Sequence, residues 1–327
     1  MMQRAEYTSR GPVPQDVIAC VERDTPTPQA GEVLLEMLAA PINPSDVLTL
    51  TGQYGMLPPL PAVGGNEGVG RVAAVGSGVT SVEVGQRVLL PVGSGTWSSH
   101  LIAPAQGLIT LPPVGDPLQL AMLVVNPPTA SLLLSEFVPL TAGDWVIQNA
   151  ANSGVGEYVI QLARRRGLRT VSVVRREDAI APLQAIGGDV VLVDGPGLAK
   201  RVAAATDNAK IRLGFDAVGG TATDRLAQCV AVGGTLVNYG ALSGEACTIA
   251  PGSFVFRDLT LRGFWLASWF RHASPAQQQA MFGELAMLIA RGELTARVHA
   301  TYPLSRVQEA VAAAAAGGRN GKILLVP

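Results

Sequence analysis

The sequence predicts an α/β protein of two domains, one mostly β and the other built on a doubly wound parallel sheet. Its 327 residues are too many for one typical hydrophobic core. Up to about residue 117 the chain is rich in Gly, Pro and Val, and short strand-like runs such as 32–39, 67–75 and 86–91 predict a partly open β-barrel. From about residue 118 strand and helix patterns alternate, which is typical of a doubly wound sheet.

The second domain is expected to hold six parallel strands with helices between them. The strand candidates are Asp144–Gln148, Thr170–Val174, Val190–Val193, Leu213–Ala217, Thr235–Tyr239 and Thr260–Phe264. The helix candidates are Pro117–Leu123, Pro128–Phe137, Asp178–Ile186, Leu198–Ala205 and Ala222–Ala231.

The end of the chain is expected to return to the first domain. Ser274-Pro275 is typical of a helix start and Gly292 of a helix stop, so a helix is predicted over Ser274–Arg291. A strand at Thr295–His299, a helix at Leu304–Ala315 and a strand at Gly321–Val326 would follow. The predicted domains are therefore residues 1–117 with 266–327, and residues 118–265.

Composition excludes several classes of protein. The formal net charge is −1 and 15% of the residues are charged, so no basic excess favours nucleic acid or a membrane surface. No run reaches about 18 apolar residues, so no membrane span is expected. The three cysteines, Cys20, Cys229 and Cys247, lie far apart, which indicates a reducing compartment without disulfides or structural zinc. With no apolar signal region at the N-terminus, a cytoplasmic protein is the expectation.

The stretch after the first predicted strand of the second domain is typical of dinucleotide binding. Asn152, Ser153, Gly154, Val155 and Gly156 form a tight turn into an amphipathic helix over about Gly154–Arg166. Small residues let the backbone approach a pyrophosphate, and the helix N-terminus offers N–H groups. The pattern is A-x-x-G-x-G rather than G-x-G-x-x-G, so the order of strand, turn, helix and strand carries the prediction. The alternative is a βα turn that binds nothing.

Two arginines follow the next predicted strand, roughly 20 residues beyond Gly156. An acidic residue there would bind a ribose 2′-hydroxyl, whereas arginine accommodates a 2′-phosphate. Arg175 and Arg176 therefore favour NADPH over NADH, because a guanidinium suits a phosphate in charge and geometry. The alternative is that both are solvated at a strand end, and Glu177 leaves that reading open.

From about residue 25 to its end the chain resembles the zinc-free members of the medium-chain dehydrogenase/reductase superfamily, and among these the 2-enoyl thioester reductases that act on trans-2-enoyl-CoA or acyl-carrier-protein substrates. The resemblance rests on the residues, the spacing and the order of several segments. They are Ile42–Asp46, Gly52–Gly55, Pro61–Gly68, Gly95–Trp97, Gln148–Gly156, Val173–Arg175 and Arg262–Leu266.

The resemblance implies a GroES-like barrel, a Rossmann domain and NADPH-dependent reduction of a trans-2-enoyl thioester, as in fatty acid metabolism. It places the catalytic tyrosine of a G-x-Y-G segment at Tyr54. It also implies a homodimer and either CoA or an acyl carrier protein as the carrier. The implied cofactor contacts are Asn126, Asn152, Ser153, Gly154, Val155, Arg175, Arg176, Tyr239, Gly240, Ala241, Leu242, Phe264, Trp265, Leu266, Ala267 and Lys322.

A catalytic zinc is not expected. Zinc-dependent relatives bind the metal with Cys and His, and the segments that look equivalent here contain Ser45 and Asn66. No thiol–imidazole spacing exists among the three histidines and three cysteines. Asp46 and Glu67 alone would bind zinc poorly, so helix capping and turn hydrogen bonds are their expected roles.

Without a metal, another group must assist the reduction of an enoyl thioester. Hydride addition builds negative charge on the carbonyl oxygen and the α-carbon, and a neutral phenol such as Tyr54 can donate a hydrogen bond or a proton there.

Each candidate residue has a structural alternative. Tyr54 could serve only in packing and Asn126 in an Asx turn. Phe264 and Trp265 could be core aromatics, and Lys322 could be a surface lysine. Two further functions also remain open, a quinone or enone reductase of the same superfamily and a non-catalytic NADPH-binding protein.

Overall fold

The computed structural model describes residues 1–327 as two compact units. The first comprises Met1–Val125 with Ser274–Pro327, and the second Asn126–Ala273. The C-terminal segment thus belongs to the first unit. Both boundaries lie a few residues beyond the predicted ones, at 125/126 and 273/274 instead of 117/118 and 265/266.

The second unit is built on a six-stranded parallel sheet of order β11-β10-β9-β12-β13-β14. The strand order reverses between β9 and β12, which is the switch point where doubly wound sheets bind ligands. All six strands were predicted, with ends shifted by at most a residue or two. They are β9 (Trp145–Gln148), β10 (Arg169–Val174), β11 (Val190–Val193), β12 (Leu213–Asp216), β13 (Thr235–Asn238) and β14 (Thr260–Gly263).

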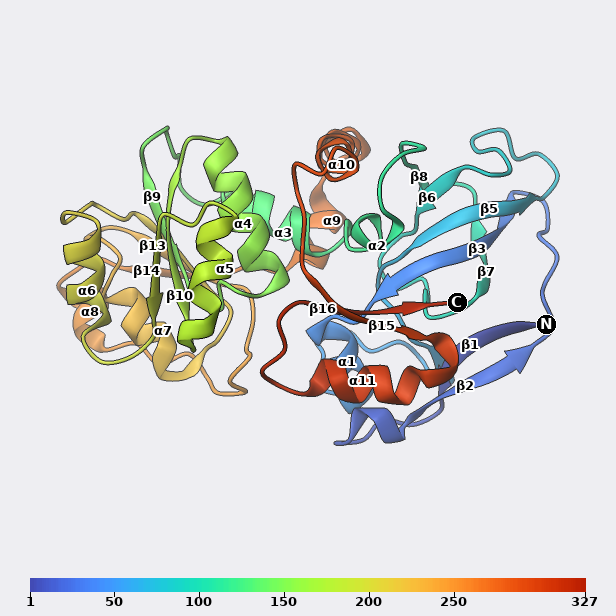
Figure 1. The fold of residues 1–327 in the computed structure, drawn as a ribbon, viewed down its shortest axis with the longest axis horizontal. Coiled ribbons are helices and arrows are strands. Elements are labelled where there is room, and N and C mark those ends of the chain that lie inside the picture. The colour runs from blue at the N-terminus through green and yellow to red at the C-terminus, as the bar shows by residue number, and fades with distance from the viewer. The chain divides into compact units, whose positions relative to one another are not determined.

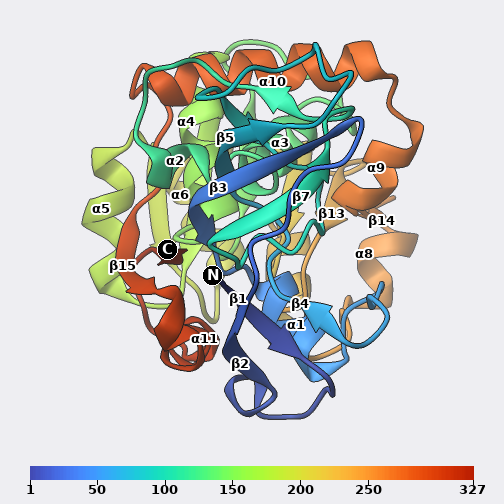
Figure 2. The same cartoon turned by 90° about the vertical axis from the view of Figure 1, so that its right-hand side faces the viewer.

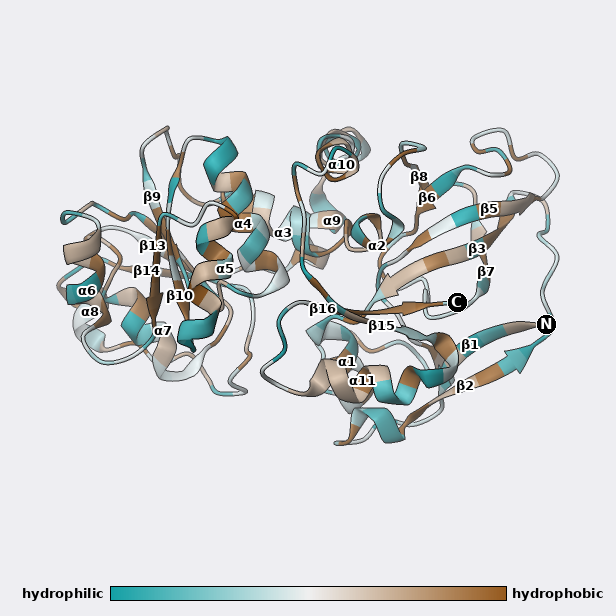
Figure 3. Ribbon diagram, in the orientation of Figure 1, coloured by the Kyte–Doolittle hydropathy of each residue, from teal (hydrophilic) through white to brown (hydrophobic).

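Helices cover both faces of this sheet. In Figure 1, α4 (Gly154–Arg165) and α5 (Ile180–Ala185) lie on one side and α6 (Leu198–Ala205) on the other. The inner strands are largely hydrophobic while the helices alternate in colour (Figure 3), because a strand inside such a sheet is buried on both faces. The remaining elements are α3 (Asn126–Leu133), the 3₁₀ turn η2 (Glu177–Ala179), α7 (Gly220–Ala227), α8 (Pro251–Val255) and α9 (Leu266–His272).

The first unit contains the predicted β-barrel. Its larger sheet has the order β15-β16-β3-β5-β6-β8, with β7 paired to β3, and its smaller sheet the order β2-β1-β4. Figure 2 shows the long strand β3 crossing this unit beside β5 and β7. The strands are β1 (Met2–Tyr7), β2 (Ile18–Arg23), β3 (Glu32–Pro41), β4 (Ala62–Val63), β5 (Val69–Val75), β6 (Arg87–Leu89), β7 (His100–Pro104), β8 (Ile109–Thr110), β15 (Val298–Pro303) and β16 (Lys322–Val326).

Trp97 fixes one corner of the barrel. It is buried, and its indole Nε1 donates to the Pro41 carbonyl at 3.2 Å. A Cβ at Gly64 would lie 2.2 Å from the indole ring and one at Gly65 2.5 Å from it. The Gly64-Gly65 pair is therefore explained by the tryptophan that lies on it, and Trp97 is a core residue.

The helices of the first unit are α1 (Pro44–Thr51), α2 (Pro117–Leu120), α10 (Pro275–Ala290) and α11 (Val307–Ala315), with 3₁₀ turns η1 (Pro14–Asp16) and η3 (Leu304–Arg306). Ser274 caps α10 through the Gln277 N–H, as predicted. Helix α11 packs on β16 and α1 over a core that includes Ile42, Leu50 and Val311.

Some predicted elements were wrong. The helix predicted over Pro117–Leu123 ends at Leu120. The strand predicted at Thr295–His299 starts instead at Val298 and runs to Pro303, because it pairs in parallel with β16. Helices α1, α8 and α9 were not predicted; each has fewer than nine residues, too few to show a clear period. None of the helices combines the length and the apolar character that crossing a bilayer requires.

Candidate cofactor site and tyrosine loop

The turn over Asn152–Val155 follows β9 and leads into α4. The Ser153 hydroxyl caps the helix by accepting from the Gly156 N–H at 3.2 Å. A Cβ at Gly156 would lie 2.4 Å from the Ala151 carbonyl oxygen, so this glycine lets the helix pack against the turn. The first turn of α4 thus presents backbone N–H groups at the carboxyl edge of the sheet, where an anion binds favourably.

Four of the predicted groups follow parallel strands of this sheet. The turn follows β9, Arg175 and Arg176 follow β10, the Tyr239–Leu242 loop follows β13, and the Phe264–Ala267 segment follows β14. Because the strands are parallel, these groups all lie at one edge of the sheet. Asn126 is the buried first residue of α3, a helix that packs on α4.

Arg175 and Arg176 differ in what they contact. Both are exposed, and Arg176 Nε donates to Asp178 at 3.1 Å. Arg175 has no hydrogen bond or ion pair, so its guanidinium is available to a ligand. The Asp194 N–H donates to the Val174 carbonyl at 2.7 Å, which fixes the end of β10 just before the two arginines.

The Tyr239–Leu242 loop is tied to β12. The Tyr239 N–H donates to the Asp216 carbonyl at 2.9 Å and the Leu242 N–H to the Ala217 carbonyl at 3.0 Å. The Tyr239 hydroxyl is buried and interacts with the side chain of Ser153, the N-cap residue of α4. Burial raises the pKa of this phenol, so it is a neutral donor at neutral pH.

The Phe264–Ala267 segment carries two half-buried aromatic side chains. Phe264 packs edge-on against Phe137, with ring centroids 5.9 Å apart, and its N–H donates to the Asn238 carbonyl at 2.8 Å. Trp265 is the N-cap residue of α9, which begins with Leu266, and the Arg271 guanidinium lies 5.1 Å from the centre of its ring. Both aromatic side chains are partly exposed, so neither belongs to the fully buried core.

Asp216, at the end of β12, was missed by the sequence analysis. Its carboxylate is fully buried and has no cationic partner; Asn149 Nδ2 donates at 2.6 Å, Thr223 Oγ1 at 2.7 Å and Asn238 Nδ2 at 3.0 Å. The N–H groups of Val218 and Gly219 also donate, at 2.9 and 3.2 Å. Burial alone would raise the pKa of Asp216, but the hydrogen bonds from Asn149, Thr223 and Val218 outweigh it and lower the pKa.

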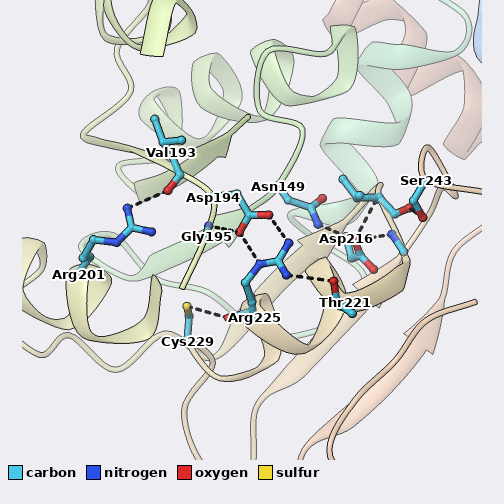
Figure 4. A network of polar contacts seen from close by, with 12 residues as sticks. Asn149, Val193, Asp194, Gly195, Arg201, Asp216, Thr221, Arg225, Cys229 and Ser243 are labelled. Carbon is cyan, nitrogen blue, oxygen red and sulfur yellow. Dashed lines mark hydrogen bonds and ion pairs between the residues drawn. The ribbon is translucent and has the colours of Figure 1, made fainter. Parts of the chain in front are cut away.

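An ion pair lies beside this carboxylate (Figure 4). Arg225 of α7 donates through Nε and Nη2 to both oxygens of Asp194, at 2.8 and 2.6 Å, and through Nη1 to Thr221. Asp194 also accepts from the Gly195 N–H at 2.8 Å. The pair joins the loop after β11 to α7.

Tyr54 belongs to the first unit and follows α1. The helix ends at Gly52, which has φ of 79° and serves as a left-handed C-cap. The Gln53 and Tyr54 N–H groups both donate to the Leu48 carbonyl, at 2.8 and 3.2 Å. Gly52, the first glycine of the G-x-Y-G segment, therefore ends the helix, and Tyr54 lies in the loop that follows. The Tyr54 side chain is half-buried on this loop.

Four polar side chains are buried together at the start of α1. Asn43 Nδ2 donates to Glu67 Oε1 at 2.7 Å, and Lys322 Nζ donates to Asn43 Oδ1. Asp46 accepts from the Asn43 N–H at 2.7 Å and from the Asn66 N–H at 2.9 Å, so its predicted capping role is confirmed. Burial raises the pKa of Asp46 to about 6 and also raises that of Glu67, although Lys322 and the hydrogen bonds oppose the shift in both.

Two predictions concern this cluster. Lys322 is 6% exposed, so the alternative that it is a surface lysine is wrong. Ser45 and Asn66, in the two segments that look equivalent to zinc-binding ones, lie together, and Asn66 Nδ2 donates to Ser45 Oγ at 3.3 Å. Nowhere in the chain do three or more His, Cys, Asp or Glu side chains form a group suited to a metal ion.

The fold and the site define a two-domain dehydrogenase/reductase, and comparison with known proteins agrees. Residues 29–113 match the alcohol dehydrogenase GroES-like domain and residues 154–282 the zinc-binding dehydrogenase family. The mitochondrial enoyl-[acyl-carrier-protein] reductase of Rattus norvegicus is 40% identical over 307 residues, 92% of this chain and 82% of the relative. That of Arabidopsis thaliana is 40% identical over 80% of this chain and 72% of the relative. The chain therefore belongs to the enoyl-[acyl-carrier-protein] reductase family of the medium-chain dehydrogenase/reductase superfamily.

Solved structures extend the comparison. The mitochondrial 2-enoyl thioester reductase Etr1p/Etr2p heterodimer from Candida tropicalis matches with a TM-score of 0.89 and 27% identity, over 100% of this chain and 99% of that one. A complex of Etr1p with NADP and crotonyl-CoA matches with a TM-score of 0.89 and 26% identity over the same shares. A putative NADPH:quinone reductase from Bacillus thuringiensis matches with a TM-score of 0.90 and 28% identity, also over 100% and 99%.

We predict that Asp216→Asn lowers the free energy of unfolding at pH 7 by about 2–4 kcal/mol, because an amide brings N–H groups against the donors that face the carboxylate. Since the folded pKa of Asp216 lies below its unfolded value of about 3.9, its contribution is present above that pH and is lost as the pH falls further. The difference between wild type and variant should therefore shrink below about pH 4.

Urea unfolding at a series of pH values measures this difference. Asp207→Asn, at an exposed turn position with φ of 52°, serves as the control and should change stability by no more than about 0.5 kcal/mol. Equal stability of Asp216→Asn and wild type at pH 7 would contradict the role assigned to this carboxylate.

Proposed function

We propose that this protein reduces the C2–C3 double bond of trans-2-enoyl thioesters with NADPH. The observation that carries the proposal is the Tyr54 loop, a G-x-Y-G segment held at the C-cap of α1, in a chain of the enoyl-[acyl-carrier-protein] reductase family. In the two segments that look equivalent to zinc-binding ones, this chain has the hydroxyl and amide of Ser45 and Asn66, and the proposed proton donor is therefore a phenol and not a metal-bound group.

The residues at the carboxyl edge of the second unit's sheet fit NADPH. The capped first turn of α4 suits a pyrophosphate, the unpaired Arg175 suits a 2′-phosphate, and the buried Tyr239 hydroxyl has hydrogen-bonding capacity left for a ligand. Asn126, Asn152, Arg176, the rest of the 239–242 loop, the 264–267 segment and Lys322 complete the proposed contacts. NADPH supplies the hydride.

Tyr54 would act on the carbonyl end of the substrate. Hydride addition at C3 moves negative charge onto the thioester oxygen and C2. A neutral phenol that donates a hydrogen bond to that oxygen stabilises the charge, and the same group is suited to protonate C2. The half-buried position of Tyr54 leaves its side chain partly accessible, which this role requires.

A quinone or enone reductase is the second candidate. It is favoured by the likeness to the putative NADPH:quinone reductase from Bacillus thuringiensis and to a mycobacterial quinone oxidoreductase with a TM-score of 0.85 and 29% identity. A non-catalytic NADPH-binding protein is the third. Against it stand the Tyr54 loop and the identity to enoyl reductases over most of the chain.

We also propose a homodimer. Strand β14 ends the parallel sheet and pairs only with β13, and all four of its residues are exposed. Large apolar side chains lie exposed next to it in the chain, among them Val255 and Phe256 at 72% and 82%. An exposed edge strand with exposed apolar side chains near it in the chain favours pairing with a second copy about a two-fold axis.

Three narrower proposals accompany the function. An acyl carrier protein is proposed as a carrier besides CoA, the reaction is proposed to need no zinc, and the protein is proposed to act in the cytoplasm, where the unpaired Cys20, Cys229 and Cys247 would stay reduced. Turnover of an enoyl-acyl-carrier-protein tests the carrier. Turnover after treatment with a chelator tests the independence from zinc, and cell fractionation tests the location.

We predict that Tyr54→Phe lowers kcat with crotonyl-CoA by about 10²–10⁴-fold, because the variant keeps the ring and loses the donor. NADPH oxidation at 340 nm measures the rate. Binding of NADPH should be unchanged, as a fluorescence titration can verify. Full turnover by the variant would refute the role of Tyr54, and turnover of quinones but of no enoyl thioester would favour the second candidate.

For cofactor selection we predict that Arg175→Gln raises the KM for NADPH about tenfold and leaves that for NADH unchanged, because only NADPH carries the phosphate that the guanidinium would bind. Arg169→Gln is the matched control. Arg169 lies at the opposite end of β10 and pairs with Asp189, so its loss should not change the ratio of the two KM values. An equal change in the KM values for NADPH and NADH would count against a 2′-phosphate contact.

For assembly we predict that Leu261→Pro converts the dimer to a monomer. The Thr260 N–H donates to Gly234 and the Phe264 N–H to Asn238, so the alternation of a strand turns the Leu261 N–H toward the free edge. Proline there removes an outward donor and leaves the pairing with β13 intact. Sedimentation measures the mass, with Leu261→Ala as control. A wild-type protein with the mass of one chain would contradict the dimer.

A further inference from the structure

We propose that Asn149 is a positioning residue: held by the Asp216 carboxylate, it keeps Ala150 in a left-handed conformation. This conformation shapes the turn over Asn152–Val155 for the pyrophosphate of NADPH. The inference rests on the proposed function for the role of that turn, and goes beyond it by assigning residues that are not themselves cofactor contacts. All of these groups lie in the second unit, at the carboxyl ends of β9 and β12.

Ala150 reverses the side to which the chain donates its hydrogen bonds. In a regular strand the N–H groups of residues two apart point to the same side. Here the Asn149 N–H donates to the Phe215 carbonyl of β12 at 3.1 Å. The Ala151 N–H donates instead to the Val173 carbonyl of β10 at 3.2 Å, and β10 and β12 lie on opposite sides of β9. The φ of 46° at Ala150 makes this reversal and starts the turn.

The left-handed conformation is unfavourable for alanine, because its Cβ approaches the following carbonyl oxygen. Three other residues besides glycine have a positive φ, and all are of the two types that tolerate it best, namely Asp207, Asn208 and Asp258. A strained residue persists only where the surrounding structure fixes it. Ala150 therefore needs a restraint, and the residue before it supplies one.

Asn149 is held through both ends of its amide. It is 4% exposed, its Nδ2 donates to Asp216 Oδ1 at 2.6 Å, and its Oδ1 accepts from the Ala217 N–H at 2.8 Å. Since a carboxylate only accepts and a backbone N–H only donates, the amide has one possible orientation. Figure 4 shows the Asn149 and Asp216 side chains facing each other. Asn149 is thus fixed in both its backbone and its side chain.

The Asp216 carboxylate is itself held in place. The Val218 and Gly219 N–H groups donate to Oδ1, the oxygen that also accepts from the amide, at 2.9 and 3.2 Å. Thr223 and Asn238 donate to Oδ2 at 2.7 and 3.0 Å. The carboxylate cannot rotate without breaking several of these bonds, so it offers a fixed acceptor at the start of the turn.

The left-handed residue is connected directly to helix α4. The Ser153 N–H donates to the Ala150 carbonyl at 2.8 Å, and Ser153 is the N-cap residue of the helix. The direction of this carbonyl therefore helps to set where the first N–H groups of α4 point, and these are the groups that suit a pyrophosphate. Without its restraint Ala150 would relax toward negative φ. NADPH would then have to restore the strained conformation, which weakens its binding.

Glycine at position 150 separates the strain from every other effect of the Asn149 side chain. Asn149→Ala removes the restraint and should raise the Kd of NADPH about tenfold. Glycine adopts a positive φ without steric cost, so adding Ala150→Gly should return the Kd to within about threefold of the wild-type value. Ala150→Gly alone should bind NADPH as the wild type does.

Three measurements on each full-length variant test this. Fluorescence titration gives the Kd of NADPH, and steady-state kinetics with crotonyl-CoA should show that the KM for NADPH follows the Kd while kcat changes little. Hydrogen exchange of the ligand-free protein reports on the turn itself. The Ala151 and Ser153 amides should exchange faster in Asn149→Ala and slow again in the double variant.

Two controls exclude a general effect of stability. Thr223→Val removes a donor from Oδ2 of Asp216, the oxygen that does not meet Asn149, and should lower the thermal unfolding midpoint without changing the Kd of NADPH. Asn149→Ala with Asp207→Gly places a glycine at a left-handed residue outside the turn, where φ is 52°, and should leave the Kd raised.

The outcomes distinguish this inference from the function beneath it. If the wild-type protein binds no NADPH, the proposed function fails and the inference fails with it. If the wild type binds NADPH and Asn149→Ala binds it equally well, the function stands and the positioning role is overturned. The role is also overturned if Ala150→Gly does not restore the binding that Asn149→Ala loses, or if Thr223→Val weakens binding as much as Asn149→Ala does.

Discussion

The carboxylate of Asp216 carries a negative charge into the interior of the second unit, and protein donors replace the water it gives up. The side chains of Thr223 of α7 and Asn238 of β13 donate to it, together with backbone N–H groups of its own loop. Asn149, after β9, also donates to it, and Figure 4 shows the Asn149 and Asp216 side chains facing each other. A buried charge without a counter-ion is tolerated only when its lone pairs are filled. The ends of β9, β12 and β13 are therefore fixed relative to one another, and these are the strands around the switch point where a ligand is bound.

In the first unit a different set of groups stabilises buried charges. There two buried carboxyls, Asp46 and Glu67, share a buried lysine, and backbone N–H groups fill the remaining oxygen positions. Breaking either network would leave a buried charge without its hydrogen-bond donors or its counter-charge, which costs far more than the loss of one surface ion pair. Both networks thus restrict the backbone beside proposed functional residues, namely the Tyr239 loop in one unit and α1 with its Tyr54 loop in the other.

The parallel sheet and the glycine turn could be predicted because each has a local cause. Runs of Val, Ile and Leu mark strands buried on both faces, and Asn152–Gly156 marks the turn into α4 by residue size alone. The Asp216 network could not be predicted, since its donors at 149, 223 and 238 come together only after the sheet has formed. The same holds for Lys322, whose partner Asn43 is 279 residues away. At this position the sequence reads Gly321-Lys322, and nothing in its local pattern shows that the lysine is buried.

A buried lysine beside two carboxyls is also unlike a lysine that simply attracts phosphate. An exposed ammonium would be strongly hydrated and mobile, whereas this one is desolvated and has lost the freedom of its four-carbon stem. That entropy is lost during folding, when the ammonium is fixed against Asn43. The charge of Lys322 in turn opposes the rise in pKa that burial causes in Asp46 and Glu67. The cluster therefore orders the lysine of β16 and the start of α1 together, because each buried charge depends on the others for its stability.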